Sequence, residues 1–177
     1  MDDLVRQAMA KWPNVPDCYG WLGLDARGRW YMRDDAAQQA GAFQSGQMQA
    51  KGSHVDHEKL KAFIERNYAS DELGRWYFQN GPQRVFVELE NTPWVWRVGS
   101  DGAVQSHTGL AAKVQSVWQD EQGHVYLLTE LGLGLVHTQD VACIAEALEY
   151  KAWTVQDCHW ANLPAQFGFV RSPAVRR

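Results

Sequence analysis

The chain has 177 residues, of which 45% are hydrophobic and 21% charged, and a formal net charge of −4 with neutral histidines. This composition is that of a globular protein, so a largely disordered chain is excluded and one domain, or two small halves sharing a core, is expected. The weak negative charge argues against general nucleic-acid binding, and no apolar run approaches the roughly 20 residues that span a bilayer.

The first predicted element is a helix over residues 3–11, where Val5, Met9 and Trp12 lie near one face and Pro13 follows as a stop. A strand over 19–24 is expected next, followed by a turn and a second strand. Residues 36–53 are rich in Gln, Gly and Ala, and we predict a loop there.

A second helix is predicted over residues 57–68, with Leu60, Phe63 and Ile64 on one stripe and Asp56 as the N-cap. Two hairpins follow it. The first runs over 76–89 with its turn at Asn80, Gly81 and Pro82, and the second runs over 94–105 with its turn at Ser100, Asp101 and Gly102.

The last part of the chain is expected to hold a strand over 113–118, a turn, and a helix over 139–151. Val141, Ile144 and Leu148 share one stripe of that helix, and Thr138 is its expected N-cap. Residues 171–177 are predicted to form a mobile tail.

One short pattern, Asp-x-x-Gly-x-(Trp/Val)-Tyr, begins at Asp25, Asp71 and Asp120, and the copies are 46 and 49 residues apart. Asp can accept hydrogen bonds from the backbone of the next residues, and Gly supplies a left-handed position, so each copy is typical of a turn that launches an aromatic strand. A helix precedes the middle copy, so we expect that copy to start a strand without closing a full hairpin.

These elements predict an α+β fold of repeated antiparallel β-hairpin units with two or three packed helices. Hairpin followed by helix occurs at 19–68 and again at 113–151. Residues 1–107 are expected to form the N-terminal repeat with a central β segment, and residues 108–170 a second repeat packed on the first. Most of the nine tryptophans are expected in the core.

Three stretches also resemble known proteins. Residues 24–31 (Leu-Asp-Ala-Arg-Gly-Arg-Trp-Tyr), a helix, residues 71–78 (Asp-Glu-Leu-Gly-Arg-Trp-Tyr-Phe) and residues 85–94 (Val-Phe-Val-Glu-Leu-Glu-Asn-Thr-Pro-Trp) follow an order that resembles uncharacterised proteobacterial families of about this length, domains of unknown function. The likeness covers about residues 19–98. It implies repeated α+β motifs and a role in signal transduction or ligand sensing. The chain departs from the pattern at 79–84, where Gln-Asn-Gly-Pro-Gln-Arg replaces a Thr-Pro-type turn.

The candidate binding residues are Arg84, Trp94, Trp96 and Arg97, which lie on predicted strands. Trp94 and Trp96 share one face of their strand, and Arg97 points the other way. Two interpretations stay open for the tryptophans: core packing, or an exposed surface that binds a partner.

The densest group of potential metal ligands is His54, Asp56 and His57. Because these residues flank a helix start, a capped helix with solvated histidines is the simpler interpretation. A metal site would need a distant ligand such as Cys158 or His159. We predict no metal and no cofactor. The Gly-rich segment at 131–138 has His137 where a dinucleotide loop needs its third glycine.

No catalytic residues are predicted. Adjacent Cys158 and His159 rarely point at each other, and the carboxylate pairs Asp34/Asp35 and Glu88/Glu90 carry no sign of convergence. Three cysteines without a CxxC pair and an acidic N-terminus favour a reducing, cytoplasmic location.

The first hypothesis is a non-catalytic regulatory or sensing module that binds a small ligand or a protein partner. It predicts an exposed aromatic patch or an apolar pocket between repeats. The alternatives are a hydrolase with a dispersed His/Asp/Cys site, and a structural homodimer formed through unpaired hairpin edges. Neither nucleic acid nor a membrane is expected as a partner.

Overall fold

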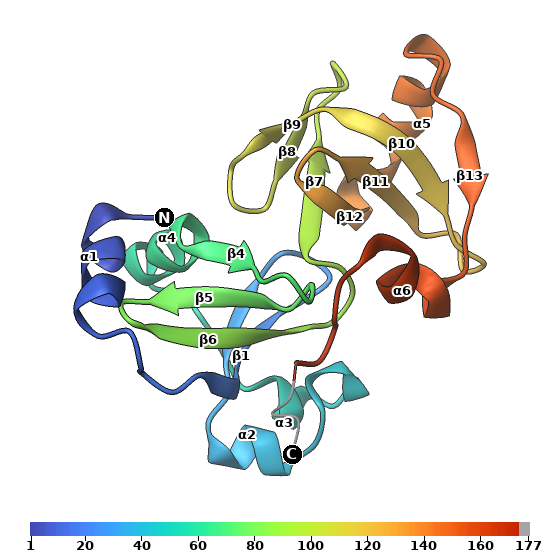
Figure 1. The fold of residues 1–177 in the computed structure, drawn as a ribbon. Helices are drawn as coiled ribbons and strands as arrows, with labels where there is room; N and C mark the ends of the chain where they lie inside the picture. Colours follow the sequence, from blue (N-terminus) through green and yellow to red (C-terminus); the bar gives the residue numbers. More distant parts are fainter. Residues whose placement is uncertain (174–177) are drawn as a thin grey trace. The chain divides into compact units, whose positions relative to one another are not determined.

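The computed structural model describes residues 1–173, which fall into two compact units. The first unit comprises Met1–Asp25, Arg29–Glu90 and the described residues from Phe169 on. The second comprises Ala26–Gly28 and Asn91–Gly168. The chain therefore leaves the first unit after residue 90 and returns to it at residue 169 (Figure 1).

The division near residue 90 differs from the boundary expected between residues 107 and 108. The reason is strand pairing: β7 (Trp94–Val98) lies parallel to β12 (Gly132–Val136), some 40 residues later in the chain. That pairing joins the hairpin at 94–105 to the later strands, and the sequence near residue 90 carries no local sign of it.

The first unit is a six-stranded sheet with five helical segments. The helical segments are α1 (Asp3–Lys11), α2 (Asp35–Gln39), the 3₁₀ turn η1 (Phe43–Ser45), α3 (Met48–Lys51) and α4 (Glu58–Arg66). The strands are β1 (Cys18–Leu24), β2 (Trp30–Met32), β3 (Ser53–His54), β4 (Tyr68–Ser70), β5 (Trp76–Asn80) and β6 (Gln83–Leu89). Their order in the sheet is β3-β2-β1-β6-β5-β4, and only β1 and β6 pair in parallel.

The second unit holds a seven-stranded sheet. Besides β7 and β12, its strands are β8 (Val104–Ser106), β9 (Ala111–Ala112), β10 (Val114–Gln119), β11 (Val125–Thr129) and β13 (Val155–Asp157). Its helical segments are η2 (Thr138–Asp140), α5 (Val141–Tyr150), η3 (Trp160–Asn162) and α6 (Leu163–Phe167). The strand order is β13-β10-β11-β12-β7-β8-β9. Both units together confirm the α+β class.

The two sheets share one arrangement of six strands. In each, a central parallel pair is extended on both sides by two antiparallel strands. In the first sheet β2 and β3 follow β1, and β5 and β4 follow β6; in the second, β8 and β9 follow β7, and β11 and β10 follow β12. The register agrees as well: Leu22 lies opposite Val87 as Trp96 lies opposite Val136, and Phe78 lies opposite Val85 as Leu127 lies opposite Gly134. This correspondence differs from the expected match of 19–68 with 113–151.

The Asp-x-x-Gly pattern forms the same turn at all three of its positions. Each Asp donates its backbone N–H to the carbonyl four residues later, and its side-chain oxygen accepts the backbone N–H of that same residue. The middle copy was predicted not to close a hairpin, and this was wrong. The three-residue strand β4 pairs with β5 across the turn at Asp71, and a strand this short gives little periodic signal after a helix.

The helix predictions were confirmed for α1, α4 and α5, with differences at the starts of α4 and α5. The N-cap of α4 is His57, whose Nδ1 accepts the N–H of Leu60 at 3.3 Å, and not Asp56 as expected. The expected N-cap Thr138 lies instead inside the 3₁₀ turn that precedes α5, where His137 accepts the N–H of Gln139.

The prediction of a loop over residues 36–53 was wrong, because the segment contains most of α2, all of η1 and α3, and the first residue of β3. These helices have only five and four residues, too few for a hydrophobic repeat to be legible. Buried Arg33 holds them. Its guanidinium donates to the carbonyls of Ala50 and Gly41 at 2.7 Å and to that of Gly20 at 3.2 Å.

The predicted mobile tail lies partly outside the described residues, which end at 173. The part that is described is held in the first unit. The carbonyl of Arg171 accepts the N–H of Leu89 at 2.7 Å and the side-chain amide of Gln44 at 3.1 Å. Within the described chain, no helix combines the length and the apolar character needed to cross a membrane.

Candidate ligand-binding site

An apolar hollow of about 260 Å³ lies on one face of the first sheet, beside α4. Its apolar wall comes from helix α4 and from strands β1, β5 and β6, through Leu22, Leu60, Phe63, Ile64, Phe78 and Val85. Trp21 and Met32 also line it and remain 42% and 51% exposed. The hollow therefore combines a closed apolar floor with two large apolar side chains that are in contact with water.

The local sequence explains how this wall forms. Leu60, Phe63 and Ile64 are spaced so that they share one face of α4, which is why the helix presents them to the sheet. Phe63 meets Phe78 of β5 edge to face, with ring centroids 5.3 Å apart, and Ile64 is buried. Leu60 does not close the remaining space, so the hollow stays open to one side.

No charged side chain lines this hollow. Besides the Trp21 indole N–H, the lining groups that can form hydrogen bonds are the Asn80 amide and the Cys18 thiol. Burial raises the pKa of the Cys18 thiol above its usual value, so the thiol is neutral at physiological pH. The site can thus bury apolar surface and offer one amide, and it holds no group suited to general acid–base chemistry at neutral pH.

The residues predicted to bind are dispersed, and two of them belong to the core. Trp94 and Trp96 stack with their centroids 5.9 Å apart, and both are buried. Their indole N–H groups donate to the carbonyls of Leu131 and Leu127 at 2.7 and 2.9 Å. The interpretation of Trp94 and Trp96 as an exposed partner surface is therefore corrected to core packing.

The two predicted arginines have different environments. Arg97 forms a bidentate pair with Asp140 at the start of α5, at 2.6 and 3.1 Å, and this pairing lowers the pKa of the Asp140 carboxyl. Arg84 lies over the ring of Tyr77, with 4.9 Å between the guanidinium carbon and the ring centroid. A ligand-binding role for Arg84 and Arg97 stays a prediction.

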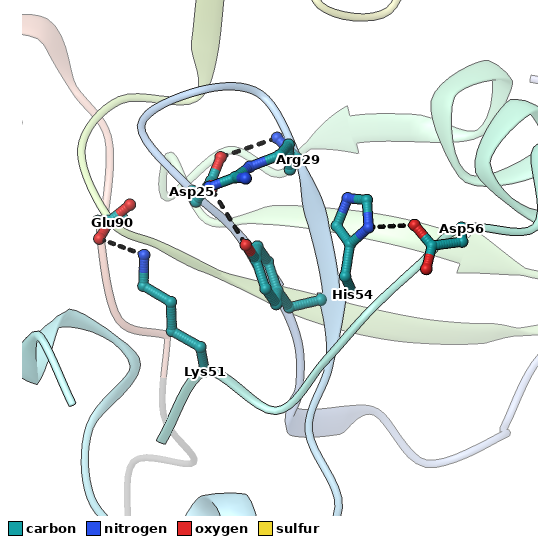
Figure 2. A network of polar contacts seen from close by, with 7 residues as sticks. Asp25, Arg29, Lys51, His54, Asp56 and Glu90 are labelled. Carbon is teal, nitrogen blue, oxygen red and sulfur yellow. Dashed lines mark hydrogen bonds and ion pairs between the residues drawn. The ribbon is translucent and has the colours of Figure 1, made fainter. Parts of the chain in front are cut away.

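The metal candidates form part of a polar network at the β2–β3 edge (Figure 2). His54 pairs with Asp56, while the His57 ring caps α4. In the same network Lys51 pairs with Glu90 at 2.7 Å, and Asp25 pairs with Arg29 at 2.8 Å. Among residues 1–173, no three His, Cys, Asp or Glu side chains are grouped so that they could hold a metal ion.

Cys158 and His159 lie in the second unit, at a hollow of about 340 Å³ shared with Asp120 and Glu121. His159 approaches Glu121 at 3.8 Å. Burial, followed by the negative charges of Asp120 and Glu121, raises the pKa of the Cys158 thiol to about 11. A thiol that is protonated at neutral pH is a poor nucleophile, so this arrangement does not favour the hydrolase alternative.

The edges of both sheets are short. Strands β3 and β4 border the first sheet with two and three residues, and β9 and β13 border the second with two and three. Short edges offer few free backbone groups for pairing with another chain. The homodimer alternative through hairpin edges stays a prediction that this geometry does little to favour.

Sequence reasoning found the apolar stripe of α4 but missed the hollow beside it. Whether a hollow forms depends on which neighbouring strands lack bulky side chains at that place in the sheet. The strands in question, β1 and β6, pair in parallel, and no local sequence signal indicates that pairing. The signal that could have indicated the hollow is a pair of large apolar residues at exposed positions of the neighbouring strands β1 and β2, namely Trp21 and Met32.

Comparison with known proteins gives a family without an assigned function. A search of curated proteins gave no match. Among solved structures, a DUF1285 family protein from Silicibacter pomeroyi DSS-3 is similar, with 14% identity, 81% of this chain and 83% of that chain covered, and a TM-score of 0.48. Residues 1–174 match the family DUF2944, described as "Protein of unknown function (DUF2946)". The chain belongs to this family of uncharacterised proteins, as its resemblance to domains of unknown function implied.

Proposed function

We propose that this protein is a non-catalytic sensing module that binds a small, uncharged apolar molecule in the hollow between α4 and the first sheet. One observation carries the proposal: a hollow of about 260 Å³ without a charged lining side chain, bordered by the half-exposed Trp21 and Met32. Exposed large apolar side chains next to an apolar hollow are what a ligand would cover on binding.

The size of the hollow limits the ligand. An apolar cavity of about 150 Å³ is known to hold benzene, and typical ligand pockets begin near 300 Å³. We therefore expect a ligand of roughly ten to fifteen non-hydrogen atoms, such as a bicyclic aromatic or a medium-length alkyl chain. A charged group buried in this lining would lose its hydration without gaining a partner, so it would have to stay outside.

The Asn80 amide gives such a ligand one point of orientation. A single hydroxyl or carbonyl group on an otherwise apolar body would satisfy it. Binding would cover the exposed Trp21 of β1, the strand that leads into the turn at Asp25. A change in the surface around Trp21 is how we expect ligand occupancy to be passed on in signal transduction.

The test is a thermal-shift and tryptophan-fluorescence titration with 1-naphthol, n-decanol and indole. A probe present at ten times its Kd should raise the melting temperature by about 3–5 °C, since such binding is worth about 1.4 kcal/mol. Probes binding at Trp21 should also change its emission.

A pair of variants tests whether the probes bind in the apolar hollow. Leu60→Trp should fill the hollow and reduce the thermal shift at least about threefold, because the added ring occupies ligand space. Leu4→Trp on α1 adds the same bulk at a position that is 80% exposed and should leave the shift unchanged. Equal shifts in both variants, or no shift with any probe in the wild-type protein, would contradict the proposal.

We further expect the protein to act in the cytoplasm, and one observation supports that. Cys18, Cys143 and Cys158 are all free thiols, as a reducing compartment would keep them. Fractionation of cells that express the full chain tests this expectation.

A further inference from the structure

Besides the apolar hollow, the first unit has a second hollow, of about 340 Å³, beside the end of α1 and the β5–β6 hairpin. Its lining residues alternate with those of the apolar hollow along β5 and β6 and at the start of β1. Asp17, Gln79 and Arg84 line this hollow, whereas their chain neighbours Cys18, Asn80 and Val85 line the apolar one. Successive side chains of a strand point to opposite faces, so the two hollows are separated by one sheet.

Two opposite charges without ion-pair partners line this second hollow. Among the described residues, Asp17 forms no ion pair and accepts only a long hydrogen bond from the Tyr19 hydroxyl, at 3.5 Å. Arg84 stacks on Tyr77 and forms no ion pair with any residue of the described chain. Most other arginines of this unit with interaction partners pair with a carboxylate, as Arg75 does with Asp71 at 2.7 Å.

The rest of the wall is apolar and aromatic. Trp12 is 51% exposed, and Met9, Pro13 and Val15 lie beside it. The Lys11 ammonium lies 4.5 Å from the centre of the Trp12 ring and adds positive charge close by. Gln79 belongs to the floor, where its side-chain amide donates to the carbonyl of Gly81 at 2.9 Å.

We propose that this second hollow binds a free α-amino acid with an apolar side chain. The carboxylate of the amino acid would pair with Arg84, the ammonium group with Asp17, and the side chain would pack on Trp12 and Met9. This site is separate from the apolar hollow of the proposed function.

The charge pattern selects a zwitterion over simpler ligands. A lone anion would meet the Asp17 carboxylate in the same hollow, and a lone cation would meet the Arg84 guanidinium. For either ion, the repulsion from the like charge would offset the attraction of the opposite charge. A molecule that carries both charges satisfies Asp17 and Arg84 together. A planar guanidinium already held on an aromatic ring is also a preorganised receptor for a carboxylate.

Isothermal titration of the full chain with L-leucine, L-methionine and L-phenylalanine tests this site. Each amino acid is compared with its N-acetyl form, which lacks the ammonium group, and its amide, which lacks the carboxylate. Each blocked form should bind at least about tenfold more weakly than the free amino acid, because one charge-assisted contact is lost. Blocked forms that bind equally well, or no binding of any free amino acid at 10 mM or below, would overturn the proposal.

Two site variants and two control variants test where the amino acid binds, so the test does not depend on the folding of a single variant. Arg84→Gln and Asp17→Asn should each weaken amino-acid binding about tenfold. Arg6→Gln and Asp35→Asn remove the same charges elsewhere on the first unit and should leave it unchanged. Unchanged binding in both site variants overturns the proposal. Should Arg84→Gln unfold, Asp17→Asn and the blocked ligands decide the question.

The readouts separate this inference from the proposed function. Leu60→Trp should abolish the response to 1-naphthol and leave amino-acid binding intact. Arg84→Gln should do the reverse. Loss of both responses in Arg84→Gln, with the fold retained, would contradict two independent sites.

Discussion

The two units build the same six-stranded arrangement but fill one place in it differently. In the second unit, the register positions that correspond to Leu22 and Val85 hold Trp96 and Gly134. Trp96 is fully buried there and donates its indole N–H to the carbonyl of Leu127. In the first unit, Leu22 and Val85 are walls of the apolar hollow.

The pairing of these positions explains the difference. A Cβ atom built on Gly134 would lie 2.3 Å from Nε1 of Trp96, so the indole needs a glycine on the neighbouring strand. With valine at that position, as at Val85, the same indole could not be seated. Two diagonally placed residues on neighbouring parallel strands, Trp96 and Gly134 in the second unit, therefore decide whether this place in the sheet is closed by a ring or left open.

The largest expected effect is the loss of that ring. Trp96→Leu gives the second unit the side chain that the first unit carries, and it should lower the free energy of unfolding by about 3 kcal/mol because a buried cavity replaces the indole. Trp12→Leu, at a half-exposed position, should cost under about 0.5 kcal/mol. Urea unfolding of both variants measures this. Similar small losses would show that Trp96 is not the packing element that distinguishes the units.

The aspartate turns provide a second comparison, with an effect near 2 kcal/mol. Asp120 and Asp71 occupy corresponding positions, but only Asp120 also accepts the hydroxyl of a following tyrosine, Tyr126, at 2.8 Å. The side chain of Asp120 is closed to solvent, and that of Asp71 is 12% exposed. Asp120→Asn should therefore cost about 2 kcal/mol and Asp71→Asn about 1 kcal/mol. Thermal unfolding of the two variants should rank them in this order.

A smaller effect is expected from acid. Burial alone would raise the pKa of Asp71 and Asp120, but hydrogen bonds and ion pairs outweigh it and hold the pKa of Asp71, Asp120 and Asp140 below its ordinary value. The unfolded chain therefore takes up protons first on acidification. The stability that these groups contribute is complete above the unfolded pKa, near pH 4, and is lost as pH falls through the folded values.

Two of those three carboxylates belong to the second unit, so that unit should lose protection first below pH 4. Hydrogen exchange followed by mass spectrometry at pH 5, 4 and 3, corrected for the intrinsic exchange rate, reads the two units separately. Earlier loss in residues 30–90 than in residues 91–168 would contradict the expectation.

The smallest effect concerns the polar edge of the first unit. The His54–Asp56 pair is exposed, and surface pairs contribute little. Asp56→Ala should change the free energy of unfolding by less than about 0.5 kcal/mol, well below any change in the second unit's buried turn. A loss above 1 kcal/mol in urea unfolding would instead assign Asp56 a structural role.

Much of the local structure was predictable because its causes are local. The turns at Asp25, Asp71 and Asp120 follow from an acceptor and a glycine within four residues, and helix α4 follows from the spacing of Leu60 and Ile64. The N-cap was misplaced by one residue because both Asp56 and the His57 ring can accept a backbone N–H.

The long-range structure was not predictable from the same signals. Nothing near Cys18 or Val85 indicates that their strands run in parallel side by side, 67 residues apart. Helices α2 and α3 depend on the carbonyl contacts of Arg33, a residue that precedes them in the chain. The apolar hollow was missed for the same reason, whereas Arg84 could be named as a candidate, still untested, because a cation on a strand is visible without knowing its neighbours.

The return of the chain to the first unit has a consequence for how the protein is made. The N–H of Leu89 and the carbonyl of Gly74 receive their partners only from Arg171 and Val170, at 2.7 and 2.9 Å. During synthesis, the whole second unit must leave the ribosome before these bonds can form. A fragment that ends at residue 90 would leave the Leu89 N–H and the Gly74 carbonyl without these partners. The first unit is therefore expected to be completed last, although most of it is translated first.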